Sequence, residues 1–254
     1  METKLAADHS KPLRRLRPVS FWLFVRYNMA RWFGFVALGP IRARRRFRFD
    51  GKDYHYFVAA YNDTWANERA VELPIVLDHL RPRDGQDILE IGNVLSHYIG
   101  LTHDVVDKYE EAPGVTNIDV LDFSPAKAYD LIVSVSTLEH VGFDEAVRDP
   151  EKPARTVNRL RGLLRPGGKL VLTFPLGYNP DLDQQLASGV LELDDVRYLK
   201  RVSASNRWQE VSARDVLGAK YGTPYPFANA IAIAVSQQKQ ETDTPGRELT
   251  SCTT

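Results

Sequence analysis

Five short segments in the middle of the chain carry its clearest pattern of apolar and polar positions. Three are apolar, β-branched runs, and each ends on polar residues or glycine. This pattern is typical of parallel strands buried on both faces of a sheet. Side chains at the carboxyl ends of such strands often form binding sites. The segments cover residues 87–93, 103–110, 117–123, 129–142 and 164–175.

The flanking patterns predict further elements around this sheet. Apolar spacing predicts a helix over 21–38 and another over 151–164. Alternation predicts a short strand within 48–56, and Asn62-Asp63-Thr64 is expected to cap a helix that runs to about Leu80. A closing strand is expected over 228–235, and the mixed stretch between the last two strands is typical of a lid or insertion.

Together these elements predict an α/β fold with a doubly wound, mostly parallel sheet. The expected organisation is a basic aromatic N-terminal arm (1–49), one domain (50–236) that includes an insertion or lid at about 176–226, and a disordered tail (237–254).

Charge is distributed unevenly, although the chain as a whole is neutral. Residues 1–49 hold twelve Lys or Arg and only two Asp or Glu. Arginine clusters at 14–17 and 42–46 flank the aromatic segment 21–39, which is interrupted by Arg26 and Arg31. These arginines disfavour a membrane span. Two alternatives stay open: an interfacial helix that places residues 11–48 on an anionic membrane surface, and an arm packed on the domain core.

The single cysteine, Cys252, excludes an intrachain disulfide and favours a reducing compartment. The first twenty residues lack the apolar core of a secretory signal. We therefore expect a cytoplasmic protein that is peripheral at the inner face of a membrane if the arm binds lipid.

Taken in order, the five segments resemble the class I (Rossmann-like) S-adenosylmethionine-dependent methyltransferase superfamily. Leu89-Glu90-Ile91-Gly92 is similar to the start of its first motif, and Leu164 to Phe174 to the entry into its fifth strand. The resemblance implies S-adenosylmethionine as cofactor and assigns its binding to the ends of the first three strands. The residues implied are Glu90, Gly92, Asn93, Asp107, Asp119 and Val120. Asp107 would hold the ribose hydroxyls.

Other roles for these carboxylates stay open, because aspartates at strand ends also serve as caps and turn formers. Asp122 is as good a candidate as Asp119 for the third strand. The first motif also departs from the family pattern, since Val94 and Ser96 replace its second and third glycines. The connections after the first two strands are so short that a helix after the second one is not expected.

The candidate for proton transfer is His140, next to Glu139 at the end of the fourth predicted strand; His97 and Tyr98 are weaker candidates. The histidine spacing indicates no metal site. Neither a phosphate-binding loop nor a nucleophile elbow is present in the sequence.

Three hypotheses about function follow. The first is methyl transfer to a small molecule, glycan or lipid-linked saccharide, with the acceptor bound by aromatic and amide side chains of the 176–226 stretch: Tyr178, Asn179, Tyr198, Asn206, Trp208 and Gln209. The second is a non-catalytic methyltransferase-like module. The third, RNA methylation that uses the basic arm, is less favoured because no Asn-Pro-Pro-Tyr-like motif follows the fourth strand.

Overall fold

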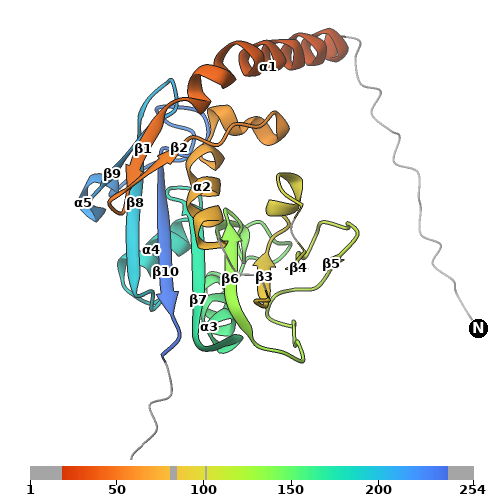
Figure 1. The fold of residues 1–254 in the computed structure, drawn as a ribbon, viewed down its shortest axis with the longest axis vertical. Coiled ribbons are helices and arrows are strands. Elements are labelled where there is room, and N and C mark those ends of the chain that lie inside the picture. Colours follow the sequence, from red (N-terminus) through yellow and green to blue (C-terminus); the bar gives the residue numbers. More distant parts are fainter. Residues whose placement is uncertain (1–18, 81–84, 101, 240–254) are drawn as a thin grey trace, which may run out of the picture.

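The computed structural model describes residues 19–80, 85–100 and 102–239. The predictions for residues 1–18 and for most of the C-terminal tail lie outside these residues. At the centre is an eight-stranded sheet with the order β5-β4-β3-β6-β7-β10-β8-β9 (Figure 1). Its strands are β3 (Ile88–Ile91), β4 (Asp104–Val106), β5 (Val115–Thr116), β6 (Tyr129–Val135), β7 (Leu164–Pro175), β8 (Asp195–Ser203), β9 (Arg207–Val211) and β10 (Ala230–Gln237).

The first five strands of this sheet are parallel, and β10 runs antiparallel to both of its neighbours, β7 and β8. The predicted doubly wound, mostly parallel α/β sheet is therefore confirmed. In β6 the burial is nearly complete, which explains why this segment lacks an alternating pattern.

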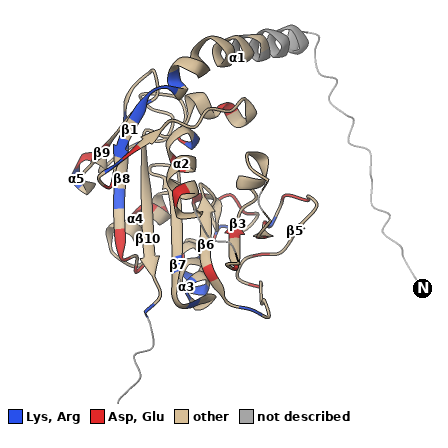
Figure 2. Ribbon diagram, in the orientation of Figure 1, with Lys and Arg blue, Asp and Glu red and all other residues tan. Residues whose placement is uncertain are grey.

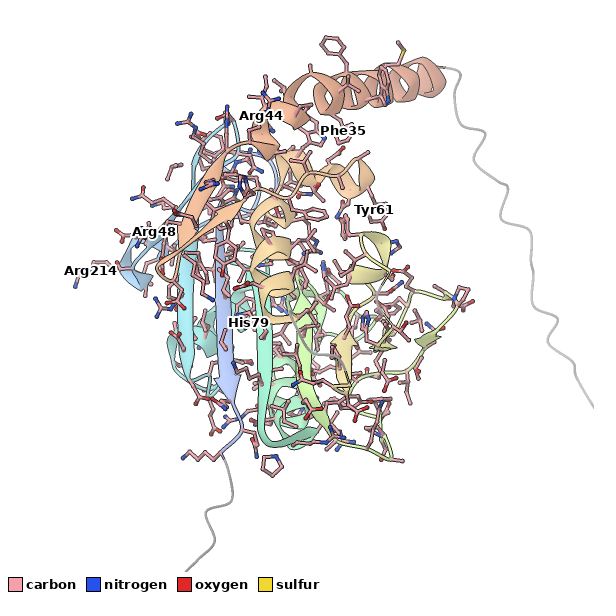
Figure 3. All side chains as sticks on the ribbon, in the orientation of Figure 1. Phe35, Arg44, Arg48, Tyr61, His79 and Arg214 are labelled. Atoms are coloured by element: carbon pink, nitrogen blue, oxygen red, sulfur yellow. The ribbon has the colours of Figure 1, made fainter. Side chains whose placement is uncertain are left out.

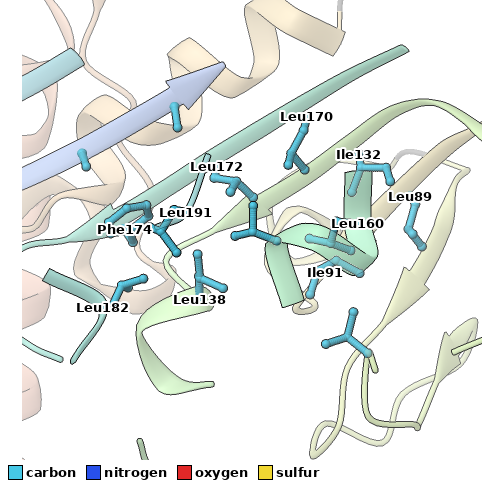
Figure 4. Packing of buried hydrophobic residues seen from close by; sticks show 14 of the residues in the cluster. Leu89, Ile91, Ile132, Leu138, Leu160, Leu170, Leu172, Phe174, Leu182 and Leu191 are labelled. Atoms are coloured by element: carbon cyan, nitrogen blue, oxygen red, sulfur yellow. The ribbon is translucent and has the colours of Figure 1, made fainter. Parts of the chain in front are cut away.

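Helices cover both faces of the sheet. On one face, α3 (Lys152–Gly162) and α4 (Pro180–Ala187) pack on a core that includes Ile132 and Leu172 (Figure 4). On the other face, α2 (Arg69–Leu80) packs on Leu131 and Val133. Because successive strand residues point to opposite faces, β6 supplies side chains to both cores.

The N-terminal elements are helix α1 (Val19–Ala43), the hairpin of β1 (Arg46–Phe49) and β2 (Lys52–His55), and the short helix η1 (Tyr61–Ala66). The β1–β2 hairpin lies beside α2 and β9, η1 lies beside α2, and α1 packs on η1. Phe47 and Phe49 are buried in one cluster with Trp208 of β9. Residues 46–49, assigned to the arm from the sequence, thus belong to the folded body.

The predicted helix start at Asn62-Asp63-Thr64 is wrong. Asn62 and Asp63 have positive φ angles of 50° and 47°, so the chain turns there inside η1. Helix α2 begins later, where the side-chain oxygen of Asn67 accepts a hydrogen bond from the amide of Arg69 at 3.1 Å.

The stretch 176–226 is more regular than a lid. It contributes β8 and β9 to the main sheet, together with α4 and the short helix α5 (Ala213–Val216). In contrast, the connections on the β3–β5 side are as short as the sequence indicates. A single turn, η2 (Leu95–His97), follows β3, and residues 107–114, all of them described, contain no helix. A third short turn, η3 (Leu138–His140), follows β6.

Candidate functional site

A cavity of about 440 Å³ lies at the carboxyl ends of β3, β4 and β6. Loops after these strands form its walls, and apolar side chains such as Val106 and Ile118 line its interior. Six of the eight residues assigned to the site from the sequence line this cavity: Gly92, Asn93, Asp107, Asp119, Val120 and His140. The other two, Glu90 and Glu139, are buried and do not line it.

Glu90 is part of the support of the cavity wall. Its Oε1 atom accepts hydrogen bonds from the amides of Val94 and Leu95 at 2.8 and 2.7 Å. Its Oε2 atom lies 2.6 Å from Nε2 of His103. The carboxylate therefore provides acceptors for the amides at the start of η2 and holds the loop in place. Its role is to support the cavity wall from the interior and not to contact a ligand.

Glycine is required at position 92 because two protein loops approach each other closely there. Its φ angle is +84°, and a Cβ atom built on it would lie 2.1 Å from Oγ1 of Thr137. The loop after β3 and the loop after β6 thus touch at this point. A side chain at position 92 would push these two walls apart.

The carboxylate of Asp107 accepts hydrogen bonds from backbone amides of its own loop and of the loop after β3. Oδ1 accepts from the amides of Tyr109 and Glu110 at 2.8 and 2.7 Å, and Oδ2 accepts from the amide of Asn93 at 3.0 Å. A carboxylate offers about four acceptor positions, so about one remains, on Oδ2.

Glu110 lines the cavity and was not assigned to the site from the sequence. Its Oε1 atom accepts from Nδ2 of Asn93 at 2.7 Å and lies 2.9 Å from Nε2 of His97. The side chain is 39% exposed, so it presents a carboxylate at the rim beside Asp107. In the sequence, its position three residues after the strand-end aspartate Asp107 could have indicated that it lies in the same loop at the site.

Asp119 forms an ion-pair cluster with three residues that had not been assigned to the site: Lys108, Glu145 and Lys152. Lys108 Nζ lies 2.9 Å from Asp119 Oδ2 and 2.6 Å from Glu145 Oε2, and Lys152 Nζ contacts both carboxylates. Partial burial raises the pKa of Asp119, but the hydrogen bonds from Lys152 and Lys108 outweigh it and lower the pKa to about 2. Asp119 is thus held as a carboxylate. Asp122, the alternative, does not line the cavity.

His140 lies at the mouth of the cavity with its side chain 47% exposed. Its Nδ1 atom is 2.5 Å from Oδ2 of Asp144, and the same oxygen accepts from the hydroxyl of Tyr178 at 2.7 Å. Burial opposes ionisation of Asp144, yet the hydrogen bonds from His140 and Tyr178 hold its pKa below the ordinary value. An ionised Asp144 favours the tautomer with the proton on Nδ1, which leaves Nε2 as an acceptor.

Glu139 belongs to a separate buried cluster behind this histidine. Its carboxylate lies 3.6 Å from His140 Nε2, and its Oε2 atom has no hydrogen-bond partner among the described residues. Burial raises the pKa of Glu139 well above the ordinary value, although Arg69 acts in the opposite direction. Arg69 is itself paired with Glu72, with Nη1 and Oε2 2.8 Å apart. Glu139 is therefore placed to influence the histidine rather than to meet a ligand in the cavity.

Of the acceptor-binding candidates in 176–226, the structure brings Tyr178 to the site. Asn179 caps α4 through its side-chain oxygen. Asn206 and Trp208 are buried among the N-terminal elements, where Trp208 Nε1 donates to Asn206 Oδ1 at 2.8 Å. The expectation for these two is wrong, because their polar groups pair with each other inside a core.

Comparison with known proteins gives structural relatives only. No family model matches the chain, and no curated protein matches it significantly. The chain is similar to the N-methyltransferase NodS from Bradyrhizobium japonicum in complex with S-adenosylhomocysteine, at 14% identity over 60% of this chain and 78% of that one, with a TM-score of 0.37. It is similar to a TehB-like S-adenosylmethionine-dependent methyltransferase from Corynebacterium glutamicum, at 18% identity over 65% and 86%, with a TM-score of 0.37. A third similar structure is a methyltransferase of the same cofactor class from Archaeoglobus fulgidus, at 13% identity over 67% and 94%, with a TM-score of 0.42.

Proposed function

We propose that the chain transfers a methyl group from S-adenosylmethionine to a hydroxyl of a small molecule, glycan or lipid-linked saccharide. The observation that carries this proposal is the combination of two features in one cavity. Strand-end carboxylates line its inner part, and a histidine oriented by a carboxylate lies at its mouth. The first feature suits a nucleoside, and the second suits removal of a proton from an acceptor.

The donor set of the cavity fits the nucleoside part of the cofactor. The remaining acceptor position of Asp107 and the carboxylate of Glu110 would take the two ribose hydroxyls. The apolar side chains of Val106, Ile118 and Val120 would pack on the faces of the adenine ring.

Bound S-adenosylmethionine would supply an electrophilic methyl group; the sulfur–methyl bond would break, and the leaving group would be S-adenosylhomocysteine. Transfer of the methyl group needs alignment more than covalent help, and the cavity walls provide the alignment. His140 would accept the proton of the acceptor hydroxyl on Nε2 as the oxygen–methyl bond forms. Asp144 would stabilise the resulting imidazolium, and Tyr178 would hold Asp144 in place.

A binding module without catalysis is the second candidate, and one observation favours it. Backbone amides already fill most acceptor positions of Asp107, and two lysines already pair with Asp119. Both carboxylates could therefore serve the fold alone. Calorimetry separates the candidates: the enzyme hypothesis expects saturable binding of S-adenosylhomocysteine, and the module hypothesis expects none.

The test of catalysis uses His140→Gln. With methyl-labelled S-adenosylmethionine and extracts of glycans and lipid-linked saccharides as acceptors, we expect label transfer to fall by about 10²- to 10⁴-fold. Binding of S-adenosylhomocysteine should stay unchanged, because His140 lies at the mouth. Asp144→Asn should lower transfer in the same direction and alter its pH profile. Full transfer by His140→Gln would contradict the assignment of the base.

A further inference from the structure

Helix α1 carries an apolar face that the described parts of the chain leave uncovered. Met29, Trp32, Phe33 and Val36 are 66%, 67%, 69% and 49% exposed. Their spacing of three and four residues places them on one side of the helix. Figure 3 shows side chains projecting from the outer side of α1, while Phe35 points toward the folded body. Large side chains are rarely left so open in a continuous row.

The other side of the C-terminal half of α1 is fixed to the body. A Cβ atom on Gly34 would lie 2.7 Å from the ring of Trp65, so helix and ring are in close contact. Arg42 Nη1 donates to the carbonyl oxygen of Trp65 at 2.6 Å, and its guanidinium lies 4.9 Å from the ring centroid. In Figure 1, α1 extends away from the sheet from this anchor. The apolar face is thus held outward in a defined direction.

Positively charged residues flank this helix on both sides in the sequence. Helix α1 contains no Asp or Glu, and the exposed arginines Arg44, Arg46 and Arg48 follow it closely (Figure 2). The sequence adds the cluster at 14–17 just before the helix. An apolar aromatic face with flanking arginines complements a lipid surface, where the acyl chains would contact the apolar face and the anionic headgroups would pair with the arginines.

We propose that α1 docks in the plane of an anionic lipid membrane through Met29, Trp32, Phe33 and Val36. Among the described residues, no helix has the length and apolar character needed to cross a bilayer, so α1 would lie on the membrane. The charge disfavours pairing of two copies through this face, because it would bring two basic arms together. RNA phosphates would pair with the arginines, but RNA would not bury the apolar side chains of Met29 and Val36.

Vesicle sedimentation of the full chain tests this proposal. We expect binding to vesicles of phosphatidylcholine with phosphatidylglycerol, weaker binding to phosphatidylcholine alone, and a decrease with salt. The double variant Trp32→Ala/Phe33→Ala should lose at least about tenfold in partition to the anionic vesicles. Leu217→Ala is the matched control, since Leu217 is 73% exposed on another part of the surface, and it should bind like the parent.

Four results would overturn the proposal. Two of them concern vesicles: the double variant binds anionic vesicles as well as the parent does, or the parent binds neutral and anionic vesicles equally. The third is a dimer in sedimentation equilibrium that the double variant abolishes. The fourth is an RNA gel shift that the double variant abolishes, with no binding of the parent to vesicles. Because the altered side chains are exposed, unchanged thermal unfolding of the variant verifies its fold. The proposal does not depend on methyl transfer, and it stands or fails separately from cofactor binding.

Discussion

Substitution of Gly92 by alanine tests how the cavity is built. At φ +84°, the new Cβ atom would lie 2.1 Å from Thr137 Oγ1 and 2.7 Å from its Cγ2. Contacts this short require one of the two loops to move. Gly114 provides a matched control, because it has the same φ angle of +84° and nothing lies within 4 Å of its Cβ position.

The two substitutions separate backbone strain from the steric contact. A left-handed conformation costs an alanine about 1–2 kcal/mol, and this cost applies to both sites. Insertion of a methyl group into a packed contact typically costs a further 1–3 kcal/mol, and this applies to Gly92 alone. We therefore expect losses in the free energy of unfolding of about 1–2 kcal/mol for Gly114→Ala and about 2–5 kcal/mol for Gly92→Ala.

Urea unfolding followed by circular dichroism measures both values, provided the m-values agree. Thr137→Ala removes Oγ1 and Cγ2, the two atoms closest to the new Cβ. The double variant Gly92→Ala/Thr137→Ala should therefore lose less free energy of unfolding than the two single variants together, by at least about 1 kcal/mol. If Gly92→Ala costs no more than Gly114→Ala, or if the double-variant cycle shows no coupling, the loop contact does not explain this glycine.

Two further predictions concern carboxylates. Asp107→Ala should weaken binding of S-adenosylhomocysteine by about ten- to a hundredfold, since a hydrogen bond to a charged group contributes about 1.5–3 kcal/mol; unchanged affinity in calorimetry would contradict the ribose assignment. For Glu139, burial raises the folded-state pKa above the unfolded one, so the folded state holds more protons and stability falls as pH rises above about 4.5. Glu139→Gln should flatten this decline in urea midpoints measured at a series of pH values above about 4.5, and an identical slope in both proteins would exclude the carboxyl as its source.

The sequence could predict the parallel core and much of the cavity for one physical reason. Parallel strands end at the same edge of a sheet, so residues directly after buried runs converge whatever the loops do. Asp107, Asp119 and His140 were found in this way, and all three line the cavity. Glu139 follows the same rule in sequence, but the turn η3 rotates its side chain into the interior.

The residues that the sequence could not assign depend on tertiary contacts. Lys152 reaches Asp119 from the start of α3, because the chain folds tightly at Gly142, where a Cβ atom would lie 2.2 Å from the carbonyl oxygen of Asp149. Asn206 and Trp208 show the opposite error. An aromatic and an amide side chain are suitable for binding a ligand. The same two residue types can also form a hydrogen bond with each other inside a core, and they do so here.

The shortened half of the fold explains why its carboxylates carry two possible roles. In this half, loops rather than helices follow β3 and β4, and loops leave backbone amides without partners. Glu90 and Asp107 between them accept five such amides, which replaces hydrogen bonds that a helix would make internally. A strand-end carboxylate used in this way retains less capacity for a ligand. In the proposed function, Glu110 would add a second carboxylate at the rim, so cofactor affinity should depend on the pair rather than on Asp107 alone.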